Sequence, residues 1–250
     1  AYTAGFWAPN RYLILVFVGI LALQDCYFLV NRRLFQMLEK EDWKGLSALL
    51  ETRIFEKKRF SEQSIRLLCN AWVVQGKPLE ILRLETLLRS VKPALVARHS
   101  LLLGIPYLLK NETGPLLAFF QPLAADAKAS DPEWIRFNLA FGYLADRRVA
   151  EAVDILEPLS AQKREPVVQL LALYLLDSNT SRSDAASAGK LADSKKAFLA
   201  RFDRDGFRKM ADKQKENLEV IILSKFINEA VDWLYNSEAP TAEVSSEATK

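Results

Sequence analysis

Amphipathic segments recur in pairs between about Asp42 and Asp177, and the pairs repeat every thirty-odd residues. In the clearest pair, apolar and small side chains fall at helical spacing on one face of each segment, namely Leu139, Ala140 and Tyr143, then Ala152, Leu156 and Leu159. The first helices of successive pairs are predicted to start near Glu62, Pro93, Pro132 and Glu165. Because a single helix pair cannot bury its own apolar face, such a chain has to stack its pairs into one helical body.

The composition agrees with an all-α fold. Leu, Ala, Lys, Arg and Glu dominate the 250 residues, nine glycines and ten prolines punctuate them, and runs of alternating polar and apolar residues are absent. The 34 basic and 31 acidic residues nearly balance at a net charge of +3. This balance argues against a phosphate-rich partner such as nucleic acid.

The positions of Leu139, Ala140, Tyr143 and Ala152 resemble those of the tetratricopeptide repeat. The resemblance covers about half the chain and implies a right-handed solenoid of antiparallel helix pairs, in which small residues let the two helices approach closely. The chain departs from the family's pattern at Leu156, where an aromatic is usual, and at Arg136, which replaces a tryptophan-like residue. A plain antiparallel helical bundle with short loops remains the alternative.

Weaker pairs surround this unit. Glu62 to Gln75 is paired with Leu79 to Arg89 across Gly76, where glycine supplies a positive φ before a proline that starts the next helix. Further segments complete the array: Pro93 to Lys110 paired with Gly114 to Asp126, Glu165 to Asp177 opening another pair, and Asp42 to Arg53 as the second helix of an incomplete first one.

An apolar block at the N-terminus predicts a single membrane anchor. It runs from Tyr12 to Leu23 and resumes from Cys26 to Val30, so a helix over 12–30 would be about 28 Å long, close to the hydrocarbon thickness of a bilayer. A buried core helix is one alternative, because Gln24 and Asp25 are costly in lipid. A cleaved signal peptide and a lipoprotein signal at Cys26 are the others.

The side of the membrane is open at this stage. Arg32, Arg33, Lys40 and Lys44 follow the span and only Arg11 precedes it, which favours a cytoplasmic body. A short tail, one span and a long domain are nevertheless the layout of an exported, signal-anchored protein, and long domains translocate largely regardless of charge. We expect an inner-membrane protein of a bacterium with its repeats in the periplasm. Cys26 and Cys69 do not decide the side, because Cys69 has no partner in the soluble part.

After Asp177 the pattern changes. Residues Ser178 to Gly189 predict a loop, Lys190 to Phe202 a helix, and Phe207 to Tyr235 a longer helix that either caps the array or docks on another protein. The predicted domains are a tail (1–11), a transmembrane helix (12–31), repeats (32–177), a helical cap (178–236) and a disordered tail (237–250).

No constellation for catalysis is recognisable. His99 is the single histidine and lies beside Arg98 on a predicted helix, so local sequence provides no poised partner for a general base. The spacing of the cysteines and histidine fits no zinc site, and no phosphate-binding loop, nucleophile elbow or dinucleotide fingerprint occurs. The acids Glu39, Glu41 and Asp42 are interpreted as a helix-start surface. We therefore expect neither an enzyme nor a cofactor.

Two surfaces remain as candidates for binding. A basic cluster of Arg53, Lys57, Lys58 and Arg59 is interpreted as a solvated loop, with contact to anionic lipid headgroups as the alternative. The concave face of a solenoid usually binds protein partners, and its first helices carry these candidate contacts: Arg66, Asn70, Arg98, Arg136 and Asn138.

The expected function is that of a membrane-anchored scaffold in the assembly or stabilisation of an envelope complex. In this it resembles anchored repeat proteins of secretion machines and periplasmic flagellar collars. The alternative is a chaperone-like or regulatory subunit that binds client segments at the membrane. A scaffold should show a sizeable apolar interface, whereas a client binder should show a polar groove.

Overall fold

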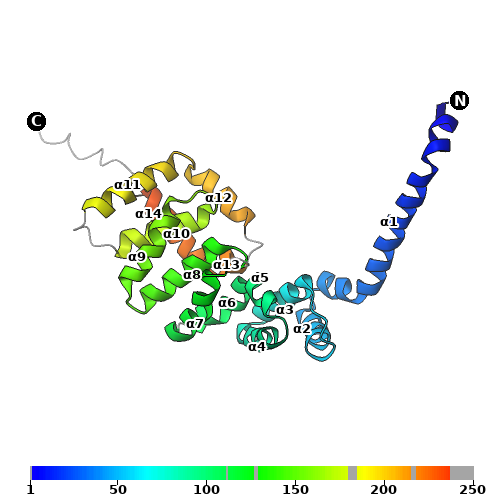
Figure 1. The fold of residues 1–250 in the computed structure, drawn as a ribbon, viewed down its shortest axis with the longest axis horizontal. Coiled ribbons are helices and arrows are strands. Elements are labelled where there is room, and N and C mark those ends of the chain that lie inside the picture. Colours follow the sequence, from blue (N-terminus) through cyan, green and yellow to red (C-terminus); the bar gives the residue numbers. More distant parts are fainter. Residues whose placement is uncertain (1, 111, 127–128, 180–184, 215–217, 237–250) are drawn as a thin grey trace, which may run out of the picture. The chain divides into compact units, whose positions relative to one another are not determined.

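The computed structural model describes residues 2–110, 112–126, 129–179, 185–214 and 218–236. Every element in these ranges is helical and none is a strand, which confirms the predicted all-α class. The chain divides into two compact units, Ala1–Lys77 and Pro78–Lys250, and Figure 1 colours them in chain order.

The first unit contains a long helix and a packed helix pair. Its elements are α1 (Tyr2–Glu39), α2 (Trp43–Glu51), the π-helix η1 (Thr52–Glu56) and α3 (Glu62–Val74). Side chains cap two of the helix starts: Gly45 N donates to Asp42 Oδ1 at 2.9 Å, and Ser64 N donates to Ser61 Oγ at 3.1 Å. Polar bonds hold the pair together, because Trp72 Nε1 on α3 donates to Glu51 Oε1 on α2 at 3.1 Å.

The second unit is a run of helices in which most neighbours in sequence are neighbours in space. Its elements are η2 (Pro78–Glu80), α4 (Ile81–Val91), α5 (Pro93–Arg98), α6 (Ser100–Lys110), α7 (Thr113–Ala124), α8 (Pro132–Ala145), α9 (Val149–Ala161), α10 (Pro166–Asn179), α11 (Ala185–Leu199), α12 (Arg204–Lys213), α13 (Leu218–Ile222) and α14 (Ser224–Asn236). From α6 to α10 each helix packs on the next, and α8 also contacts α6 and α10.

The clearest predicted pair is present as α8 and α9. All six residues of the proposed packing pattern are buried, and Ala140 and Ala152 are completely inaccessible to solvent. Two glycines also let neighbouring helices approach closely. A Cβ at Gly142 of α8 would overlap Leu116 of α7, and one at Gly104 of α6 would overlap the ring of Phe120. Small side chains therefore set the distances between α6, α7, α8 and α9.

The last helix covers one side of α10. Tyr174 of α10 meets the rings of Phe226 and Trp233 of α14 at centroid distances of 5.3 and 5.4 Å. The indole Nε1 of Trp233 also donates to Asp177 Oδ2 at 3.0 Å. These contacts are the ones that a capping helix would make.

Several predicted helices have different limits. The helix expected from Pro93 to Lys110 breaks into α5 and α6 at His99, whose φ of −113° and ψ of 24° do not continue an α-helix. The long helix expected from Phe207 to Tyr235 is three helices, α12 to α14. The expected loop after Asp177 is shorter on both sides, since α10 continues to Asn179 and α11 starts at Ala185.

The division of the chain also differs from the predicted one. The helices at Glu62 and Leu79 were expected to form one pair, but α3 packs on α2 in the first unit while α4 packs on α5 and α6 in the second. Gly76 does adopt the expected positive φ, at 70°. The predicted tail at 1–11 is part of α1 from Tyr2 onward, and the predicted disordered tail at 237–250 lies outside the described residues.

Candidate membrane anchor and binding groove

The part of α1 from Tyr12 to Val30 is strongly apolar. Every side chain described between Tyr12 and Val30 is exposed, and Leu15 and Leu23 are 67% and 74% exposed. The helix is long and apolar enough to cross a membrane, and a signal sequence would have the same length and composition. The alternative of a buried core helix is wrong, because this part of α1 is not buried.

Near Tyr27, side chains of α1 contact other elements of the first unit. The hydroxyl of Tyr27 donates to Gln63 Oε1 of α3 at 3.1 Å, and Nη1 of Arg53 in η1 donates to Asn31 Oδ1 at 3.4 Å. One turn further along, Leu34 is only 4% exposed. Polar contacts with η1 and α3 therefore hold α1 at Tyr27 and Asn31, whereas its described apolar side chains as far as Val30 are exposed.

The five predicted partner residues are divided between the two units. Arg66 is exposed and Asn70 half-buried on α3 of the first unit, while Arg98 and Arg136 are exposed on α5 and α8 of the second. Asn138 is 1% exposed, so the structure does not present it to a partner. Asn138 lies on the buried face of α8. The sequence does not reveal this, because a polar residue is normally expected on the exposed face of a helix.

The histidine and the cysteine of the helical body are buried, whereas Glu39, Glu41 and Asp42 are exposed. His99 is 8% exposed at the junction of α5 and α6, and the thiol of Cys69 lies fully buried in α3. Among the described side chains, no group of three or more His, Cys, Asp or Glu residues is placed to hold a metal ion.

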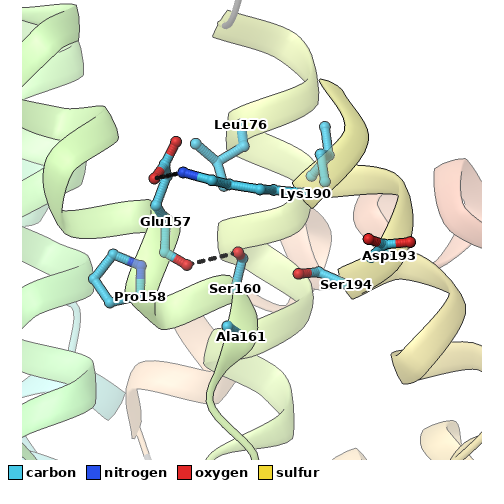
Figure 2. A pocket seen from close by; sticks show the side chains of 9 residues that line it. Glu157, Pro158, Ser160, Ala161, Leu176, Lys190, Asp193 and Ser194 are labelled. Carbon is cyan, nitrogen blue, oxygen red and sulfur yellow. Dashed lines mark hydrogen bonds and ion pairs between the residues drawn. The ribbon is translucent and has the colours of Figure 1, made fainter. Parts of the chain in front are cut away.

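A groove that sequence reasoning missed lies between α11 and the α9–α10 pair. A pocket of about 490 Å³ is lined by Glu157, Pro158, Ser160, Ala161, Leu176, Lys190, Leu191, Asp193 and Ser194. A second pocket of about 250 Å³ shares three of these residues and continues the groove to Lys163, Gln169, Ala197 and Arg201. Figure 2 shows α11 contributing Lys190, Asp193 and Ser194 opposite the wall from α9.

The groove is open because α11 is rich in small side chains. Ala188, Gly189, Ala192 and Ala197 are small and exposed, so these positions of α11 reach little towards its neighbours. The helix is held instead by its C-terminal Phe198, which is fully buried, and by ion pairs of Lys190 with Glu157 at 3.4 Å and Lys195 with Asp177 at 2.8 Å. The run of small residues from 185 to 189 is the signal in the sequence for this groove, but the sequence pattern predicts a loop there.

The lining combines apolar walls with charge. Ser160 Oγ donates to the Glu157 carbonyl at 2.8 Å, and Gln169 bridges Ser160 O and Arg201 with bonds of 2.9 and 3.2 Å. These polar groups are already satisfied, while the Asp193 carboxylate is exposed at the rim.

Comparisons with known proteins agree with the boundary between the units. A family model described as "Uncharacterised Treponema protein" matches residues 80–236, which nearly coincide with the second unit. An "Uncharacterized protein" of Treponema pallidum (strain Nichols) is 28% identical over 232 residues, covering 88% of this chain and 74% of its own length. This coverage exceeds the second unit alone, so the similarity extends into the first. No solved structure matches the chain. Because the family model covers more than half of its residues, the chain belongs to the family of uncharacterised Treponema proteins.

Proposed function

We propose that this protein is a membrane-anchored helical scaffold that binds other proteins in the assembly or stabilisation of a bacterial envelope complex. The observation that carries the proposal is the exposed apolar part of α1, joined without a break to a packed helical body. A soluble protein would expose this surface to water at a large cost in free energy, and a bilayer removes that cost.

The body has the features of an interaction module. Consecutive helices pack in sequence order, small residues set the spacing of α8 and α9, and α14 covers α10. These features support a tetratricopeptide-like solenoid whose surface, including the groove beside α11, contacts partners. In this proposal α1 stays in the inner membrane and the body lies in the periplasm.

One observation favours a second candidate, a client-binding or regulatory subunit at the membrane. Among the described side chains beyond α1, the large apolar ones that are exposed are spread over different elements: Val74, Leu79, Val91, Leu109, Val149 and Ile221. The groove itself is partly charged. A permanent interface would more often present a continuous apolar area.

The anchoring is tested with full-length protein that carries a C-terminal tag in spheroplasts. We expect the tag to remain with membranes after alkaline carbonate extraction and to be degraded by added protease, which indicates a periplasmic body. A tag that stays with the membranes but resists protease would move the body to the cytoplasm. A soluble tag would overturn the anchor.

The interaction role is tested by purification from mild detergent. A scaffold copurifies with a partner in fixed stoichiometry, whereas a client binder exchanges. The double variant Arg66→Glu/Arg136→Glu changes two exposed cations and should reduce partner recovery while helicity is retained. The matched control Arg66→Lys/Arg136→Lys keeps both charges and should recover normal amounts. Equal recovery in both variants would remove these arginines from the interface.

A further inference from the structure

The segment from Arg53 to Gln63 lies beside the turn of α1 at which the helix leaves the body. The side chain of Arg53 bonds Asn31, that of Gln63 bonds Tyr27, and Asn31 Nδ2 donates to the Tyr27 carbonyl at 3.0 Å. Between these contacts the chain folds back on itself, since Arg59 N donates to Arg53 O at 3.0 Å. Lys58 occupies the turn with a φ of 51°. The segment is thus fixed at the level of Tyr27 to Asn31.

The length of the anchor determines how near that level is to lipid. The exposed apolar stretch from Tyr12 to Val30 rises about 28 Å as a helix, close to the roughly 30 Å of hydrocarbon in a typical bilayer. Arg11 precedes the stretch, and Tyr27 lies near its other end with a hydroxyl bonded to Gln63. A span of this length places its two ends near the headgroup region, where tyrosine is common. When α1 spans a bilayer, the Arg53–Gln63 segment therefore lies at the level of the headgroups.

The side chains at this level are mainly basic and available. Five of them are exposed and form no ion pair with a carboxylate in the described chain: Arg32, Arg33, Lys57, Lys58 and Arg59. We call these five residues the basic collar. Glu56 and Glu62 are the exposed acids in the same segment and reduce, but do not reverse, its positive charge.

The larger group of acids lies farther from the membrane. Glu39 follows Tyr27 by twelve residues of continuous helix, which is about 18 Å, and Glu41 and Asp42 come after it. This separation exceeds the Debye length of about 8 Å at physiological ionic strength. At physiological ionic strength these acids, which lie beside Lys40 and Lys44, therefore do little to neutralise the cations at the level of Tyr27 to Asn31.

We propose that the basic collar binds the phosphate groups of anionic lipids at the membrane face where α1 emerges. The inference rests on the proposed function, because it requires α1 to be held in a bilayer. Headgroup binding fixes the first unit against the membrane surface, so that the anchor is a docked module and not a flexible tether.

The experiment is hydrogen–deuterium exchange of the full-length protein in lipid nanodiscs. One set of discs contains phosphatidylcholine alone, and the other contains about 30% phosphatidylglycerol. We expect the amides of residues 56–62 to exchange several-fold more slowly in the anionic discs at 50 mM salt and equally in both at 500 mM, because salt screens headgroup contacts. Equal exchange in the two lipids at low salt would overturn the proposal.

Two triple variants distinguish lipid binding by the basic collar from an effect of the protein's overall net charge. Lys57→Gln/Lys58→Gln/Arg59→Gln removes three collar cations and should abolish the difference between the discs. Lys196→Gln/Lys209→Gln/Lys213→Gln removes three exposed cations of α11 and α12 and should preserve it. All six side chains are exposed, so both variants should melt like the parent protein. A loss of the difference in both variants would show a net-charge effect and refute the collar.

A last set of measurements distinguishes binding to a lipid surface from binding to free phosphate, and it also tests the anchor itself. Millimolar glycerophosphoglycerol added to neutral discs should give no protection, and protection equal to that in anionic discs would overturn a lipid surface as the ligand. A chain that elutes apart from the discs would refute the anchor and with it this inference. A chain that stays in the discs without lipid-dependent protection would refute the collar alone.

Discussion

Two strongly apolar helices of this protein have opposite surroundings. In α10, nine of fourteen side chains are buried, because α8, α9, α11 and α14 all contact it. Between Tyr12 and Val30, α1 is similarly apolar, yet each described side chain is exposed. A helix that is apolar on all sides is stable only inside a protein core or inside a membrane. The comparison shows that neighbouring helices of the fold bury α10, whereas the described side chains of α1 between Tyr12 and Val30 remain exposed.

The largest expected effect, on membrane attachment, comes from placing charge in the exposed apolar part of α1. Val16→Arg/Ile20→Arg should release the protein from membranes, because two arginines near the centre of a span cost about 5 to 7 kcal/mol of insertion free energy. The melting temperature of the helical body should not change, since both side chains are exposed. Carbonate extraction and thermal melting measure the two effects. Val16→Leu/Ile20→Leu is the control, and its release from membranes would contradict the anchor.

The reciprocal change in α10 should unfold the body and leave membrane attachment intact. Leu171 is fully buried, so Leu171→Arg would bury an unpaired charge and should cost more than about 4 kcal/mol of unfolding free energy. Circular dichroism of the solubilised protein measures the loss, and Leu171→Met should cost less than about 1.5 kcal/mol. A folded arginine variant would show that α10 is less enclosed than this structure has it.

The packing between helices of the second unit is probed at Ala140. This side chain is fully buried between α8 and its neighbours, so Ala140→Trp should overfill the contact and cost about 1 to 3 kcal/mol of unfolding free energy. Ala150 on α9 is exposed, and Ala150→Trp should be nearly neutral. Thermal melting distinguishes them. Equal melting temperatures would be inconsistent with close packing at Ala140.

The second unit also buries a polar group whose removal should raise the free energy of unfolding. Both amide atoms of Asn138 are buried without a hydrogen-bond partner among the described residues. Asn138→Leu keeps a similar volume and should raise the unfolding free energy by about 1 to 3 kcal/mol, the usual desolvation cost of one unsatisfied group. Asn138→Asp should lower it. A destabilised leucine variant would reveal a bound water in this position.

The smallest effect is expected at the start of α10. Partial burial raises the pKa of the Glu165 carboxyl, Glu133 and Asp131 raise it further, and Arg164 opposes them. The folded state therefore binds this proton more tightly, so the associated stability is present at low pH and is lost as the pH rises through the raised pKa. Glu165→Gln removes this loss and should be more stable at pH 7.5 by less than about 1 kcal/mol.

Melting curves at pH 4 and pH 7.5 test this sign. The gain of the glutamine variant over the parent should be larger at pH 7.5 than at pH 4. A gain that is larger at pH 4 would mean that the Glu165 carboxylate is stabilised in the folded protein.

Much of the fold was predictable because its signals are local. Helix starts at Glu62 and Pro132 coincide with the predictions, and the start at Glu165 is one residue from Pro166. Capping and proline residues at these places act within one turn of chain. The break at His99 and the separation of α12, α13 and α14 were not predictable, because the apolar pattern continues through them and the competing contacts come from distant helices.

The candidate sites were predicted less well for the same reason. The exposed apolar part of α1 followed from length and composition alone. Asn138 was expected on the surface although it is buried, and the groove beside α11 was not predicted, although a helix was expected from Lys190 to Phe202. A polar residue or a run of small residues can be buried or exposed, depending on the face of the helix that carries it. Only the packing of neighbouring helices determines which face is buried.

By itself, the sequence determined the helical state of the chain, the positions of most turns and the presence of a long apolar N-terminal helix. These properties depend on periodicity, on Gly and Pro, and on side-chain polarity within a few residues. The tertiary structure alone decided that α3 packs on α2, that Arg53 and Gln63 hold the turn where α1 leaves the body, and that small side chains of α11 leave a groove. These contacts join residues far apart in sequence, so they depend on which helix faces meet and not on local pattern.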